Sequence, residues 1–193
     1  MLSIHTIITN VRQALIQTFT EVDGWFDTPA ELLAYVPETG GWRIEQILEH
    51  ISLTNHFLLI LIDKGRIRVL KSADEERLRE ALAGYVFNSL ALDEVGKPGS
   101  FDWMRPDHME PTGKIALAEV RATLHQQHRS CLDTLEALPN GEGVLSKTTM
   151  TVNNLGKLDV YQYLYFLAQH ARRHLTQMSR VRELHERMAD TDG

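Results

Sequence analysis

The sequence contains nine histidines in 193 residues, and histidine is the commonest side chain for binding a transition metal near neutral pH. His170 and His174 are four residues apart in a segment with helical periodicity. One helical turn separates such positions, so both imidazoles can reach the same ion. His50 lies in another long helical segment, about 120° around the helix from the polar side that contains His56. These three histidines are therefore candidate ligands of one divalent metal ion.

The three histidines also allow a less specific interpretation, in which they bind no common ion. Pairs of histidines at a spacing of four arise by chance, and each of the three could instead be hydrogen-bonded separately at the edge of a core. An inward-facing His50 favours the metal site, because one ion would satisfy all three imidazoles. His128 also faces inward, and we expect it either to border the same cavity or to be a satisfied core histidine. The other five give no reason for selection: His5, His56, His108, His125 and His185.

Other catalytic motifs are missing from the sequence. A zinc-protease helix needs Glu directly after its first His, and Ala171 occupies that position. No Asp or Glu is followed three residues later by His, which excludes the paired Glu-x-x-His motif of di-iron bundles. Cys131 has no local signature of a nucleophile. Glu49 adjoins His50 but projects about 100° away from it, so no carboxylate is placed as a general base.

The elements that must position these side chains are predicted to be helices. Apolar residues recur every three or four positions, and caps such as Ser3 and the pair Asp159 and Gln162 mark helix starts. The pattern predicts long helices over 4–23, 42–63, 112–138 and 159–188, a short helix after Thr28, a helix over 73–91, a loop over 96–111, and no helical periodicity over 144–154. The chain is thus predicted to be all-α, a four-helix bundle with short additional helices in its connections, in a single domain over 1–193.

The composition limits the partners and the location. Acidic residues outnumber basic ones by 26 to 20, and the net charge of -6 disfavours nucleic acid. The longest aliphatic or aromatic run covers 57–62, whereas a membrane-spanning helix needs about 20 such residues. We therefore expect no membrane association and no targeting segment. A lone Cys131 fits a reducing cytoplasm, and the apolar helix faces favour a homodimer.

Two segments resemble those of the DinB-like family of metal-dependent proteins. The first is a Trp-led helix with a His near its second turn, Gly41-Trp42-Arg43-Ile44-Glu45-Gln46-Ile47-Leu48-Glu49-His50. The second is a last helix that carries His-x-x-x-His, Gln169-His170-Ala171-Arg172-Arg173-His174-Leu175-Thr176-Gln177. The resemblance covers nearly the whole chain. One departure is Arg43, where many relatives have a Ser or Thr that caps the helix, and the loop over 96–111 is also less typical.

The resemblance implies an up-down-down-up bundle in which His50, His170 and His174 bind one divalent ion. Nickel or zinc is expected, with iron or manganese as alternatives. Characterised members of the family include bacillithiol-dependent thiol transferases, mycothiol-dependent isomerases and the iron-binding region of ergothioneine-forming enzymes. The resemblance therefore implies a site more firmly than it implies a reaction.

The leading hypothesis is a metal-dependent enzyme of the thiol S-transferase or hydrolase type, acting on a small molecule such as a low-molecular-weight thiol. Three neutral ligands leave the ion its double charge and an open position, which lowers the pKa of a bound water or thiol. Arg172 and Arg173 could bind the carboxylates of such a thiol, although a solvated helix face is the favoured interpretation. The alternative is a non-catalytic bundle for dimerisation or ligand binding. A stress-linked role on DNA conflicts with the charge.

Overall fold

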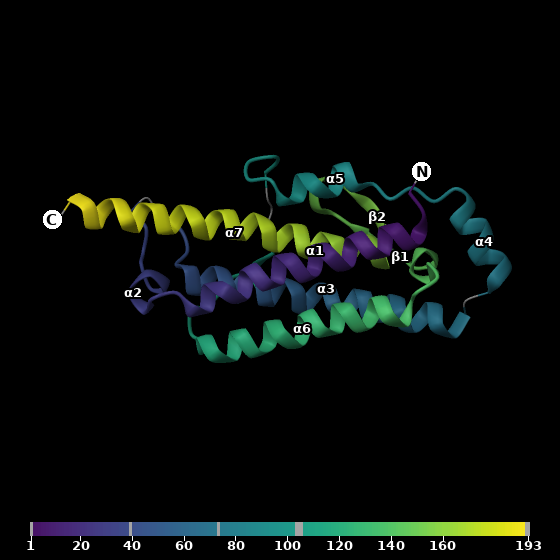
Figure 1. The fold of residues 1–193 in the computed structure, drawn as a ribbon, viewed down its shortest axis with the longest axis horizontal. Coiled ribbons are helices and arrows are strands. Elements are labelled where there is room, and N and C mark those ends of the chain that lie inside the picture. The colour runs from purple at the N-terminus through teal and green to yellow at the C-terminus, as the bar shows by residue number, and fades with distance from the viewer. Residues whose placement is uncertain (1, 39, 73, 103–105, 192–193) are drawn as a thin grey trace.

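Four long helices form the body of the computed structural model, which describes residues 2–38, 40–72, 74–102 and 106–191 (Figure 1). They are α1 (Ile4–Gly24), α3 (Ile44–Ser72), α6 (Leu117–Ala137) and α7 (Val160–Thr191). Helices α1 and α7 run in one direction and α3 and α6 in the other, so the order is up-down-down-up. Helix α1 packs against α6 and α7, and α3 packs against the same two helices. The predicted all-α four-helix bundle is confirmed.

The core lies where the apolar stripes of these helices meet. Helix α1 begins at Ser3, whose hydroxyl accepts a hydrogen bond from the backbone N–H of Thr6, and its apolar residues at helical spacing, such as Leu15 and Phe19, are buried. Helix α6 also buries one apolar stripe, whereas parts of α3 and α7 are buried on nearly all sides, at residues 47–52 and 166–171. Within the described part of the chain, no helix is both long and apolar enough to cross a membrane.

Short elements make the connections between the long helices. They are η1 (Trp25–Asp27), α2 (Ala30–Leu33), α4 (Glu75–Ala83), α5 (Ser89–Asp93), η2 (Glu94–Gly96), η3 (Asp107–Met109), η4 (Glu142–Leu145), β1 (Lys147–Met150), η5 (Val152–Asn154) and β2 (Gly156–Asp159). The two strands pair antiparallel, with Lys147 opposite Asp159 and Met150 opposite Gly156. For the segment over 144–154 the sequence predicts only a lack of helical periodicity, and much of this segment forms the hairpin.

Several predicted helices have different bounds in the structure. Helix α3 continues nine residues beyond the expected end at Asp63. Gly65 lies inside the helix, where the lack of a side chain allows close packing: an added Cβ would lie 3.0 Å from Cγ2 of Val160. The helix predicted over 73–91 is divided into α4 and α5 by residues 84–88, which belong to neither helix, and Asn88 caps α5 by accepting from the N–H of Ala91. Its expected first residue, Ala73, lies outside the described residues.

The start of α7 is held by a buried carboxylate. Asp159 and Gln162 form the predicted reciprocal cap, in which each side chain accepts from the other residue's backbone N–H at 3.0–3.1 Å. Tyr85 donates a second hydrogen bond to Asp159 at 2.7 Å. Burial raises the pKa of Asp159 to about 6, although the Tyr85 hydrogen bond acts in the opposite direction. These bonds fix the position at which the helix that carries His170 and His174 begins.

An ion-pair cluster joins α1 to α6 and gives a pH-dependent prediction. Nε and Nη2 of Arg121 donate to the two carboxylate oxygens of Asp23 at 2.8 and 2.9 Å, and His125 contacts the same carboxylate at 2.6 Å. The Arg121 hydrogen bonds, with a smaller contribution from His125, lower the pKa of Asp23 to about 2. The folded pKa is below the unfolded value of about 4, so this stability is present above pH 4 and is lost as the pH falls through about 2.

We expect Asp23→Asn to lower the free energy of unfolding by about 1 kcal/mol at pH 7, a value reduced for solvent screening because the Asp23 side chain is 34% exposed. The difference from the parent should shrink steadily below about pH 4. Urea unfolding at pH 7, 4 and 3 measures it. Asp133→Asn, at an exposed aspartate of α6, is the matched control. A difference that does not change with pH would contradict this account.

Candidate metal centre

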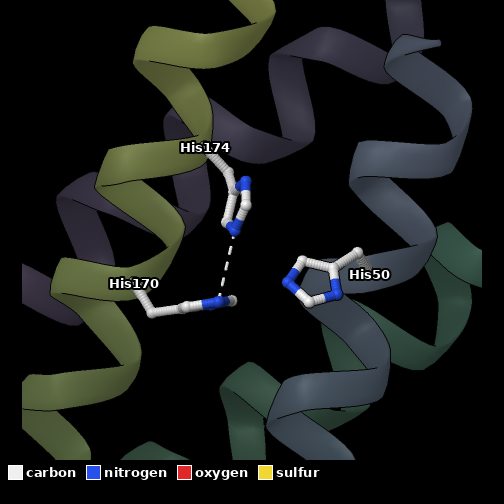
Figure 2. Close-up of side chains that lie close together, drawn as sticks. All are labelled: His50, His170 and His174. Carbon is white, nitrogen blue, oxygen red and sulfur yellow. Dashed lines mark hydrogen bonds between the residues drawn. The ribbon is translucent and has the colours of Figure 1, made fainter. Parts of the chain in front are cut away.

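Three buried histidines from two antiparallel helices converge inside the bundle. Figure 2 shows His50 on α3 and His170 and His174 on α7, with their rings directed into the space between the helices. One ring nitrogen of each lies within 4.8 Å of the others, so the three could hold a metal ion. The side chains are 2–7% exposed. The structure thus brings together the three histidines that the sequence selects as candidate ligands.

The contacts of two of the rings determine which nitrogen faces the centre. Nδ1 of His50 donates to the backbone carbonyl of Met109 at 2.7 Å, and Nδ1 of His174 donates to Oε1 of Gln177 at 2.8 Å. With Nδ1 protonated, the lone pair of each neutral ring is on Nε2. Metal-bound histidines usually donate their other N–H to a carbonyl or carboxylate in this way. The structure therefore provides outer-shell partners for His50 and His174 as well as the ring nitrogens themselves.

The distances and charges in the cluster are compatible with a divalent ion. Nε2 of His170 and Nε2 of His174 are 3.2 Å apart, and two ligands about 2.0–2.1 Å from a tetrahedral zinc ion lie roughly 3.3 Å apart. Burial, followed by repulsion from His50, lowers the pKa of His174 to about 3, and burial also holds the pKa of His170 well below its usual value. Both imidazoles are therefore neutral at pH 7, which is the protonation state that a metal requires.

A buried carboxylate next to the cluster holds the loop that orients His50. Oε1 of Glu49 accepts hydrogen bonds from the backbone N–H and the hydroxyl of Thr112 at 2.8 and 2.9 Å. Oε2 accepts from the N–H of Gly113 at 2.7 Å. Glu49 is only 2% exposed, and the loop that it anchors contains Met109. Helix α6 begins at Leu117 rather than at the predicted Thr112, because Gly113 has a φ of +65°, which an α-helix does not accommodate.

Trp42 closes one side of the cluster. Its ring centroid lies 4.7 Å from that of His50 and 6.5 Å from that of His174, and its indole N–H donates to Oε1 of Glu110 at 3.2 Å. The N–H of Arg43 donates to Oε1 of Gln46, which supplies a helix-start contact where relatives are expected to have Ser or Thr. Trp42, which lies two residues before the start of α3, therefore tethers the same loop that contacts His50.

His128 is not part of this site, which corrects the expectation that it could border the same cavity. It stacks on Phe19 of α1 with ring centroids 5.3 Å apart, and it lines a separate small cavity with Val22 and Leu124. Burial lowers its pKa. The predicted inward direction of His128 is correct. Its side chain, however, points to the interface of α6 with α1, whereas the cluster lies between α3 and α7. His56 is exposed, as its place on the polar side of α3 predicts.

A cavity of about 510 Å³ opens beside the cluster, within the range of roughly 300–1,000 Å³ that is common for small-molecule sites. All three histidines line it, as do Trp42 and Arg173. No Asp or Glu occurs among the described residues that line it. Arg172 is exposed on the outer face of α7, whereas Arg173 reaches the cavity wall. The two arginines, which the sequence does not distinguish, therefore have different surroundings.

The fold and the cluster define a class: an all-α bundle with a buried three-histidine site that could hold a metal ion. The family model for the DinB superfamily matches residues 8–178, a span that includes all three histidines. The chain belongs to the DinB superfamily, which confirms the resemblance of its two histidine segments. No curated protein and no solved structure gave a significant match.

Proposed function

We propose that the chain is a metal-dependent enzyme in which His50, His170 and His174 hold one divalent ion, and that it is of the thiol S-transferase or hydrolase type. The observation that supports this most strongly is the convergence of three buried imidazoles at the wall of a cavity that can accept a small organic molecule. Imidazole donors suit nickel, zinc and iron, whereas manganese, the remaining expected metal, prefers oxygen ligands. Membership of the DinB superfamily is consistent with this assignment.

A bound divalent ion would supply a Lewis-acid position that lowers the pKa of a water or thiol. The chain contributes the shape and the protonation state of the site. The carbonyl of Met109 and the amide of Gln177 keep Nε2 of His50 and His174 directed inward. Trp42 and the surrounding apolar side chains exclude bulk water from the rings.

The nucleophile is expected to come from the substrate or from water rather than from a protein thiol. Cys131 is 0% exposed, and burial raises the pKa of its thiol to about 12. It also does not line the cavity beside the histidines. The cavity therefore offers space for an incoming thiol or water, while the chain's own cysteine is protonated and enclosed in the core.

A non-catalytic role is the second candidate, and one observation favours it. The cluster joins α3 to α7, so an ion held there would cross-link two helices and could serve stability alone. In that case removal of the ion would lower the melting temperature, and no substrate would be turned over.

Elemental analysis and an activity panel test the proposal together. Protein purified without chelators is expected to contain about one equivalent of divalent metal. A panel of low-molecular-weight thiols with a common electrophile, and a panel of esters, should then reveal turnover that chelation abolishes and metal restores. Protein without metal would contradict both candidates. Protein with metal but without turnover in either panel would favour the structural role.

A further inference from the structure

The wall of the cavity beside the histidines is largely apolar. Its lining includes Trp42, Leu58, Leu61, Met150, Val152 and Phe166. Burial of apolar surface contributes roughly 25 cal/mol per Å², so this wall favours a ligand with a hydrocarbon or aromatic body. A small hydrophilic molecule would leave most of the wall without complementary contacts.

The charge of the cavity is opposite in sign to that of the whole chain. The net charge of the chain is -6, yet Arg173 is the one Lys, Arg, Asp or Glu among the described residues that line the cavity. The remaining polar lining groups are uncharged: Trp42, Thr54, Thr149, Thr151, Tyr163 and Gln177. An ion held by three neutral imidazoles would add two further positive charges. An anionic ligand is therefore favoured here, and a cationic one is disfavoured.

Arg173 is held in place at this wall. It is half-buried, and its Nη1 donates to the backbone carbonyl of Lys97 at 2.9 Å, which ties α7 to the segment after η2. A guanidinium carries five N–H donors in a planar fork, and the fork matches the two oxygens of a carboxylate. Arg173 and the three histidines line the same cavity, so a carboxylate at Arg173 would place the rest of the ligand in the space next to the cluster.

We propose that this cavity selects an amphipathic carboxylate: an organic anion whose carboxylate pairs with Arg173 and whose apolar body lies against the Trp42 and Phe166 side of the cavity. This inference deepens the proposed function, since it names the substrate class of the same site. It assigns Arg173 a role in specificity, and it assigns Arg172 none.

Isothermal titration calorimetry with three probes of equal chain length tests the proposal: octanoate, 1-octanol and octylamine. The parent protein, as purified and after chelation, is expected to bind octanoate at least about tenfold more tightly than 1-octanol, and octylamine more weakly than either. Arg173→Met should weaken octanoate binding by roughly tenfold or more and leave 1-octanol binding unchanged. Arg173→Lys should retain part of the preference, because it keeps the charge and loses the fork.

Arg172→Met is the matched control, since it removes the neighbouring arginine from the outer face of α7 and should leave all three affinities unchanged. Equal binding of octanoate and 1-octanol by the parent would overturn the proposal, as would an Arg173→Met variant with unchanged octanoate affinity. The chelated protein separates this inference from the proposed function. A preference for octanoate that depends on Arg173 in protein without metal would support the anion site even if the metal-dependent activity failed.

Discussion

Replacement of His170 by alanine is expected to abolish stoichiometric metal binding. His170 is the most buried residue of the cluster, at 2% exposed; its Nε2 lies 3.2 Å from that of His174, and its ring centroid lies 5.2 Å from that of His50. Loss of an outer-shell partner typically weakens metal binding by about 10–100-fold, and loss of one of three direct ligands should exceed this. Elemental analysis of the purified variant, and competition with a chromophoric chelator, measure the effect.

His56→Ala is the matched control for this experiment. His56 is on the same helix as His50 but is exposed, so the variant removes an imidazole without touching the cluster. Its metal content should equal that of the parent. Circular dichroism should show that both variants keep the helical bundle. A folded His170→Ala protein with the metal content of the parent would exclude the three-histidine site, and the enzyme proposal would fail with it.

The second large effect is expected at Glu49, a residue that is predicted not to touch the ion. Glu49→Gln is nearly isosteric, but a neutral amide replaces a carboxylate that accepts three hydrogen bonds from Thr112 and Gly113. Its NH₂ group would face at least one backbone N–H, which leaves buried donors unpaired at a cost of about 1–3 kcal/mol. We expect the free energy of unfolding to fall by about 2–3 kcal/mol.

The same variant should also weaken metal binding, by about 10–100-fold. The physical reason is that the loop anchored by Glu49 carries the Met109 carbonyl, which fixes the tautomer and orientation of His50. Urea unfolding of the chelated protein measures the first effect, and a metal titration measures the second. Glu45→Gln is the control, because Glu45 is one turn earlier on α3 and pairs with Arg43 at a partly exposed position; it should change either quantity little. Lost stability with unchanged metal affinity would limit Glu49 to a structural role.

Local periodicity is sufficient to predict the bundle and the three candidate ligands. A helical face is determined by spacing along the sequence, so the inward direction of His50, His170 and His174 follows from the order of the residues alone. The same rule fails for His128. Spacing shows that a residue points inward, but it does not show which pair of helices it faces, and His128 faces Phe19 of α1.

Contacts between distant segments cannot be predicted in this way. The spacing places Glu49 about 100° from His50 around the helix, and Glu49 does not line the cavity beside the histidines. What covers it is a loop 63 residues further along the chain, and no periodicity in either segment indicates that pairing. The hairpin of β1 and β2 is also not predicted from the sequence, because its strands are too short to show a periodic pattern. It is only four residues long on each side, and it turns through Asn153 and Asn154 with positive φ, a conformation that is uncommon outside glycine although asparagine adopts it more often than most residues.

The partner of His50 is a main-chain carbonyl, and this changes what comparison of sequences or a mutational scan would reveal. Every residue type at position 109 carries the same oxygen, so substitutions of Met109 would test the cavity wall and leave the His50 contact intact. Substitutions of Glu49 or Thr112 are the ones expected to disturb the His50 contact, because these two side chains hold the loop in position. A mutational scan of the residues nearest to the histidines would therefore miss the Met109 carbonyl, because a side-chain substitution does not remove a backbone oxygen.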